Sequence, residues 1–225
     1  DIDGLFTGAN EIKKEILNTN AKANPLLQAA AHTAYLYIEE EQKVDQTVFM
    51  PYSSKLKDLS FWYVQLWAES LGKFSKDKGH AVGLTPIPAY GATDQHSQMQ
   101  LFMEGPNNKL MFLLDIEKRE NNYELDSSLD MQSAKNLAPH SLNDLMRAEF
   151  QGTLQALDDN KRNLIKITLD QLTPENIGGL VMYFEALTTI MGDYLFINPF
   201  DQPGVEKSKI YAYEYLRSLE KTADK

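Results

Sequence analysis

The chain has 225 residues, of which 43% are hydrophobic and 24% are charged, a composition typical of a folded protein with a real core. Its formal net charge of -10 disfavours nucleic acid as a partner, because a polyanion would be repelled. The absence of cysteine excludes disulfides, thiolate metal sites and a cysteine nucleophile, and suits a reducing, cytoplasmic location. No run of about 18 apolar residues lacks a charge, so we expect no membrane-spanning helix.

The first 45 residues are predicted to form lead-in helices. Helical spacing of apolar residues runs over 8–19 and 26–40, and Pro25 is well placed to begin the second helix. The chain begins DIDGLFTGAN, with neither an initiator methionine nor a signal peptide, so we expect it to be an excised part of a longer protein.

Residues 46–199 alternate between strand and helix patterns. The runs TVFMPY, KLMFLLDIE and NLIKITLD are apolar and predict strands. Helices are predicted at 53–72 (capped by Ser53 or Ser54), 94–104, 142–159 and 174–196, and 118–140 is predicted to be a long polar connection. Strands separated by helices indicate an α/β fold in which a parallel sheet is covered on both faces. A final amphipathic helix is predicted within 200–225.

Glu69 is the first candidate catalytic residue. It lies seven residues after Trp62 and three after Leu66, so on a helix it would share their face and be partly desolvated. It also lies in the last turn before Gly72, where the negative helix end disfavours a carboxylate. Both effects would raise its pKa, as a general base requires. The alternative is a rim glutamate paired with Lys73.

His96 is the second candidate. Thr93 is a natural helix cap, which would place His96 at the third helical position, among exposed N–H groups at the positive helix end. That field attracts anions and favours a neutral imidazole, which can accept and return a proton near pH 7. An ordinary surface or hydrogen-bonded histidine fits the sequence equally well. Asp94 also raises the question of a metal site, but no third ligand is spaced nearby.

The segment NPFDQPGVEKSK contains the third group of candidates. Gln202, Glu206 and Lys209 are predicted to project from neighbouring parts of one helix face. A lysine at this position can hydrogen-bond a ligand hydroxyl. The alternative is a capped helix with a solvated Glu206–Lys209 ion pair.

Three blocks, taken in order and with fitting spacing, resemble the bacterial glucose-6-phosphate isomerase family: FMPYSSKLKDLSFWYVQLWAESLGK, GATDQHSQMQLFMEGPNNK and FDQPGVEKSK. The resemblance covers nearly the whole chain as the C-terminal part of that enzyme. It implies the second sugar-isomerase (SIS-type) domain, a three-layer α/β/α domain with a parallel sheet, at residues 46–199. Helices at 1–45 and 200–225 would flank it.

The resemblance also implies an activity and a role for each candidate. The family interconverts glucose 6-phosphate and fructose 6-phosphate through a cis-enediol, in glycolysis and gluconeogenesis. Glu69 matches the base that moves a proton between C2 and C1, and His96 matches the ring-opening histidine, which reaches the partner subunit's site in a homodimer. Lys209 matches the lysine at the ring oxygen, with Gln202 as a substrate contact. Neither a cofactor nor a metal is expected, because the enediol route needs only a base, an acid and oxyanion stabilisation.

The family's first domain supplies a Ser/Thr-rich phosphate loop and an arginine beside the enediolate, and neither is found in this sequence. We therefore expect the chain to be inactive by itself and to need the missing N-terminal domain. A noncatalytic sugar-phosphate-binding regulatory module remains the alternative, since the fold alone cannot separate the two. A glycoside hydrolase has less support, because no second acid is paired with Glu69.

Overall fold

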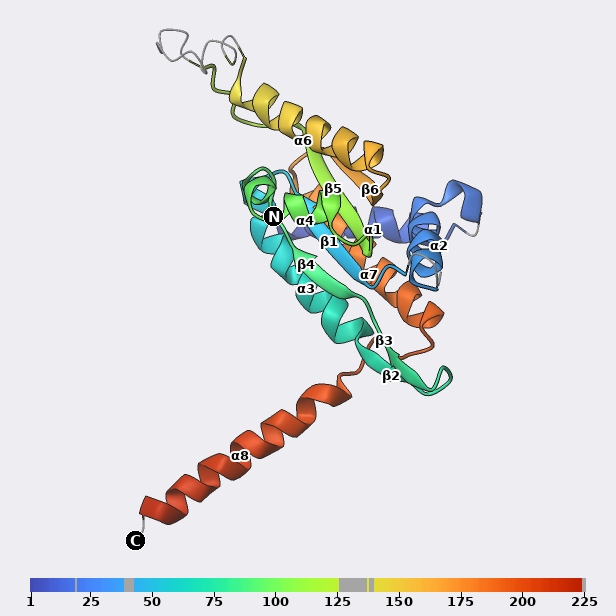
Figure 1. Ribbon diagram of the computed structural model, residues 1–225, viewed down its shortest axis with the longest axis vertical. Helices are drawn as coiled ribbons and strands as arrows, with labels where there is room; N and C mark the ends of the chain where they lie inside the picture. Colours follow the sequence, from blue (N-terminus) through green and yellow to red (C-terminus); the bar gives the residue numbers. More distant parts are fainter. Residues whose placement is uncertain (19, 39–42, 126–136, 138–139, 224–225) are drawn as a thin grey trace.

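The structure is a computed structural model that describes residues 1–18, 20–38, 43–125, 137 and 140–223. Its centre is a parallel four-stranded sheet in the order β4-β1-β5-β6 (Figure 1). The strands are β1 (Gln46–Pro51), β4 (Thr85–Pro88), β5 (Lys109–Lys118) and β6 (Asn163–Gln171). The first eight residues of β5 are buried, as expected for a strand covered on both faces. The sequence did not predict β4, whose Thr-Pro-Ile-Pro run suits an edge strand because proline cannot donate to a sheet.

Helices cover both faces of the sheet. Phe49, Phe112 and Leu114 point to one face, where they pack in one cluster with residues of α2 (Pro25–Ile38), α3 (Lys57–Leu71) and α7 (Pro174–Tyr194). Met50 and Met111 point to the other face, towards α4 (Met99–Glu104) and α6 (Leu142–Asp159). The alternation follows from the two-residue period of a strand. The predicted three-layer α/β/α arrangement is therefore confirmed.

Helix α1 (Ile2–Ile16) packs against α7 with almost no side chain between the two backbones. A Cβ atom on Gly8 would lie 1.7 Å from the carbonyl oxygen of Glu175, and one on Gly178 would lie 1.9 Å from that of Leu5. Only glycine allows such an approach. The helix begins six residues before the predicted start at residue 8, because Asp1 caps it by accepting a 3.0 Å hydrogen bond from the Gly4 amide.

Short elements lie at both ends of α3 and between α1 and α2. A 3-10 turn, η2 (Ser54–Leu56), leads into α3, and Ser53 precedes it without the predicted capping hydrogen bond. After α3, β2 (Lys73–Ser75) and β3 (His80–Val82) form a small antiparallel hairpin that the sequence did not predict. A short 3-10 turn, η1 (Ala21–Ala23), joins α1 to α2.

Helix α8 (Pro203–Ala223) extends away from the rest of the chain (Figure 1), and its side chains up to residue 219 are exposed. It matches the final helix predicted within 200–225. Most of the predicted 118–140 connection lies outside the described residues. None of the helices in the described ranges is long and apolar enough to cross a membrane.

Candidate active site

Two predicted site residues meet at the end of α3. Glu69 lies in the last turn of this helix, and Gln202 lies just before Pro203, where α8 begins. The Gln202 Nε2 donates a 3.1 Å hydrogen bond to Glu69 Oε2, across 133 residues of sequence. The structure therefore joins the first and third sequence blocks at one point.

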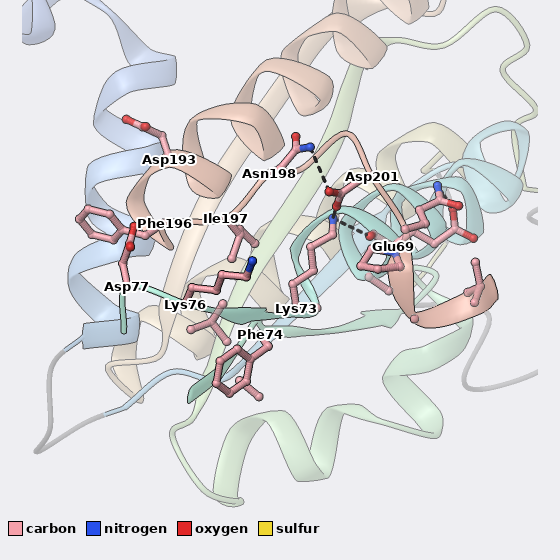
Figure 2. Close-up of a pocket in the computed structure, with 18 residues that line it drawn as sticks. Glu69, Lys73, Phe74, Lys76, Asp77, Asp193, Phe196, Ile197, Asn198 and Asp201 are labelled. Carbon is pink, nitrogen blue, oxygen red and sulfur yellow. Dashed lines mark hydrogen bonds and ion pairs between the residues drawn. The ribbon is translucent and has the colours of Figure 1, made fainter. Parts of the chain in front are cut away.

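A pocket of about 1460 Å³ opens beside this contact (Figure 2). Its walls come from the end of α3, the β2–β3 hairpin and the loop between α7 and α8, and they include Glu69, Phe74, Phe196 and Gln202. Eight of the 18 lining residues are charged or amide residues and the others are apolar or glycine, so the pocket offers both polar and apolar contacts to a ligand.

Lys73 lies on the wall of this pocket with its side chain only 8% exposed. Its Nζ donates to the carbonyl oxygens of Glu69, at 3.2 Å, and of Ser70, at 2.6 Å, and it forms a 3.7 Å ion pair with Asp201. Burial lowers the pKa of Lys73, and the Asp201 carboxylate opposes that shift. The alternative reading of Glu69 as a rim glutamate paired with Lys73 fits the exposure of Glu69 but not the pairing, because the ammonium group contacts the backbone of Glu69 and the carboxylate of Asp201.

The expected desolvation of Glu69 is also wrong. The side chain is exposed, and its neighbours on the predicted face, Trp62 and Leu66, are themselves only partly buried. The last turn of α3 reaches the open pocket, so the carboxylate faces that space. Gln202 is its hydrogen-bond partner within the described part of the chain.

His96 lies in a different kind of turn from the one predicted. The 3-10 turn η3 (Thr93–His96) is followed by α4 only at Met99, so His96 is exposed before the helix and not at its third position. Asp94 tightens the turn by accepting hydrogen bonds from the Tyr90 amide, at 2.7 Å, and from the Ser97 hydroxyl, at 2.6 Å. Thr93 therefore does not cap a continuous helix, and His96 does not line the Glu69 pocket.

A partly buried polar network that the sequence did not reveal holds this turn. Gln95 Nε2 donates to the Tyr52 hydroxyl at 2.9 Å and to the Thr153 hydroxyl at 2.5 Å. Gly91 lies against the Tyr52 ring, where a Cβ atom would meet ring carbons at 2.6 Å. Burial raises the pKa of Tyr52 and so favours the neutral phenol. The residue next to His96 is thus tied to Tyr52, which directly follows β1, and to Thr153 of α6.

Lys209 lies on α8, where it forms a 2.9 Å ion pair with Glu206. Both side chains are exposed, which matches the alternative of a solvated pair. Helix α8 contributes only Pro203, Gly204 and Val205 to the pocket lining, so Lys209 does not join Glu69 in this chain. In the described ranges, no three histidine or acidic side chains are grouped in a way that could hold a metal ion.

The sequence profile of the phosphoglucose isomerase family matches residues 1–225. The chain belongs to the phosphoglucose isomerase family. A glucose-6-phosphate isomerase from Carboxydothermus hydrogenoformans is 38% identical over 220 residues, which cover 96% of this chain and 47% of that protein. A probable glucose-6-phosphate isomerase from Methanococcus maripaludis is 37% identical, over 96% of this chain and 46% of that protein.

Two solved structures share the fold. A protein from Thermus thermophilus described as hypothetical superposes with a TM-score of 0.88 at 33% identity, covering 96% of this chain and 50% of its own. A glucose-6-phosphate isomerase from Chlamydia trachomatis gives a TM-score of 0.78 at 20% identity, over 96% and 43%. The predicted family and fold are confirmed, and the chain spans about half the length of the relatives it matches.

Proposed function

We propose that the chain is the C-terminal part of a glucose-6-phosphate isomerase and carries the base of that enzyme. The observation that supports this most directly is the 3.1 Å contact between Gln202 and Glu69 at the edge of an open pocket. Family membership, and relatives named glucose-6-phosphate isomerase at 37–38% identity, supply the reaction class.

In the proposed mechanism, Glu69 takes the proton from C2 of the open-chain aldose while O1 gains a proton, which gives a cis-enediol. Glu69 then returns a proton to C1 while the O2 hydroxyl loses its proton, which gives the ketose. The Gln202 amide occupies Oε2 and so leaves Oε1 to face the substrate. A carboxylate with one oxygen fixed in this way has a defined direction for proton transfer, which general base catalysis requires. Gln202 also contacts a substrate hydroxyl. The route needs no metal and no redox cofactor.

The other two candidates, His96 and Lys209, complete the site from outside the Glu69 pocket. His96 is exposed and anchored through Gln95, so we propose that it opens the sugar ring in the site of a second subunit of a homodimer. Lys209 acts at the ring oxygen when α8 packs on another part of the enzyme. Exposed apolar side chains on α8, among them Ile210, Tyr213 and Leu216, are consistent with such packing.

The proposal assigns phosphate binding to the half of the relatives that this chain does not span. A phosphate loop and an arginine beside the enediolate would come from that N-terminal domain. The complete enzyme would work in glycolysis and gluconeogenesis in the cytoplasm.

The test is Glu69→Gln in the complete enzyme, with glucose 6-phosphate as substrate. The amide keeps the shape of the side chain but cannot take a proton, so kcat should fall by at least about 100-fold while substrate affinity changes little. Glu185→Gln, at an exposed position on α7, is the matched control and should retain wild-type turnover. Isomerisation at a near-normal rate by Glu69→Gln would rule out the assigned base. A wild-type protein that binds the sugar phosphate without isomerising it would favour the regulatory module.

A further inference from the structure

Lys73 connects the two segments that hold Glu69 and Gln202. Gly72 ends α3 with its amide hydrogen-bonded to the Ala68 carbonyl, and the chain then turns so that the Lys73 side chain lies back under the helix end. Its ammonium group contacts the Glu69 and Ser70 carbonyls in the last helical turn. It also contacts the carboxylate of Asp201, the residue before Gln202, and Figure 2 shows it between Glu69 and Asp201. One partly buried cation thus binds the segment of the base and the segment of its amide partner.

The electrostatics of this contact favour a fixed geometry. The last carbonyls of α3 carry the negative end of the helix dipole, and Asp201 adds a full negative charge nearby. A lysine with only 8% of its side chain exposed offsets both charges, and its ion-pair partner Asp201 is 55% exposed. Asn198 Nδ2 donates a 3.1 Å hydrogen bond to the second oxygen of Asp201, so this carboxylate is held on both sides.

Few other contacts fix this loop near Gln202. The Ser75 hydroxyl donates to the Phe196 carbonyl at 3.1 Å, but this contact lies at the far end of the loop, next to α7. Among the described residues, the ion pairs and side-chain hydrogen bonds that join residues 201–202 to the end of α3 or to Lys73 are the Lys73–Asp201 ion pair and the Gln202–Glu69 hydrogen bond itself. Gln202, the donor of the hydrogen bond to Glu69, belongs to this loop. Without Lys73, that hydrogen bond alone would have to hold the loop in place.

We infer that Lys73 is a positioning residue, which holds Asp201 and thereby sets the Gln202 amide against the Glu69 carboxylate. This inference rests on the proposed function of Glu69 as the base. It assigns Lys73 no contact with the substrate. A lysine that served only to cap the helix end would need the two carbonyl contacts and not the ion pair with Asp201.

The experiment is a double-mutant cycle in the complete enzyme, with kcat/KM for glucose 6-phosphate as the readout. The variants are Lys73→Met, Gln202→Ala and their combination. If Lys73 acts through Gln202, Lys73→Met should lower kcat/KM by about 10- to 100-fold, since a misplaced base is slow. The same change in the Gln202→Ala background should alter it by less than about twofold. Lys73→Arg should restore most of the rate, because a guanidinium group can still reach Asp201.

Three controls make each outcome decisive. Lys57→Met, in the exposed first turn of α3, should behave as wild type. If Lys73→Met does not fold, Asp201→Asn removes the same ion pair from its half-exposed partner and takes its place in the cycle. Equal losses from the Lys73 change in both backgrounds would overturn the inference, because they would indicate a role independent of Gln202. If Glu69→Gln is itself active, the proposed function fails together with this inference, whereas an inactive Glu69→Gln confines any failure to Lys73.

Discussion

Tyr63 makes the stability of the fold sensitive to alkali. It is fully buried between the sheet and α7, and its hydroxyl donates a 2.7 Å hydrogen bond to Thr47 Oγ1. Burial raises its pKa far above the ordinary value of 10.0. Below that ordinary value the phenol is protonated in both the folded and the unfolded chain, so the free energy of unfolding does not depend on this group. Above it only the unfolded chain ionises, so stability falls as pH rises.

We therefore expect the free energy of unfolding in urea to fall above pH 10 by about 1.4 kcal/mol per pH unit from Tyr63 alone. Tyr63→Phe should be less stable at neutral pH by about 1 kcal/mol, because Thr47 loses its partner. The same variant should lose less stability between pH 9 and about 11. Burial also raises the pKa of Tyr183, to about 12, so the stability of this variant should still depend on pH to a smaller extent. Identical pH slopes for Tyr63→Phe and the wild type would contradict this account.

At the scale of single residues, the sequence predicted the chemical type of the site residues better than their burial and their contacts. The resemblance selected Glu69 and Gln202, and the structure brings them within 3.1 Å. The expected desolvation of Glu69 failed because helical spacing says which residues share a face and not what covers it. The Lys73–Asp201 ion pair was missed for a related reason, since its partner lies far along the chain and no local pattern connects the two.

At the scale of elements, the crossing of α1 and α7 depends on the absence of side chains. Gly8→Ala would place a methyl group 1.7 Å from the Glu175 carbonyl oxygen, so the helices must separate. We expect a loss of at least about 1–3 kcal/mol in the free energy of unfolding, measured by urea denaturation. Gly152→Ala is the matched control on α6, where nothing lies within 4 Å, and should stabilise by about 0.5–1 kcal/mol. Equal changes in the free energy of unfolding for the two variants would contradict a role of Gly8 in the close approach of α1 and α7.

Helix boundaries followed the sequence where capping is local. Helix α6 runs over 142–159 as predicted, because Ser141 and Asp144 form a reciprocal capping box, and α7 begins at Pro174 behind a Thr173 cap. The helix predicted at 94–104 forms only from Met99, as α4, and the prediction failed before that residue. The Gln95 side chain bonds to Tyr52 and Thr153 on other elements, and this tertiary network replaces a regular first helical turn. Such contacts are not visible in the spacing of neighbouring residues.

At the scale of the whole molecule, residues 1–225 alone should bind glucose 6-phosphate poorly and show negligible isomerisation. A phosphate dianion would meet a chain of net charge -10 without the hydroxyl, backbone and arginine donors that we assign to the other half. Loss of one preorganised donor to a developing oxyanion can cost about 100- to 1000-fold in rate. Coupled-enzyme assay and calorimetry would measure both properties. Adding the separately produced N-terminal half should restore turnover. Turnover by this chain alone at about 1–1000 per second would refute the assignment of phosphate binding to that half.

Glu69 and Gln202 are 133 residues apart, so the two residues are synthesised at different times. The sheet is parallel, so its pairings join distant segments, and contacts of that kind form slowly. During synthesis the strands and α3 leave the ribosome well before Gln202 does. The hydrophobic core can then be complete while Glu69 still has no amide partner. A chain that ended at Ile197 would keep the residues of the core packed around α2, α3 and α7 but would lack Gln202, the amide partner of Glu69.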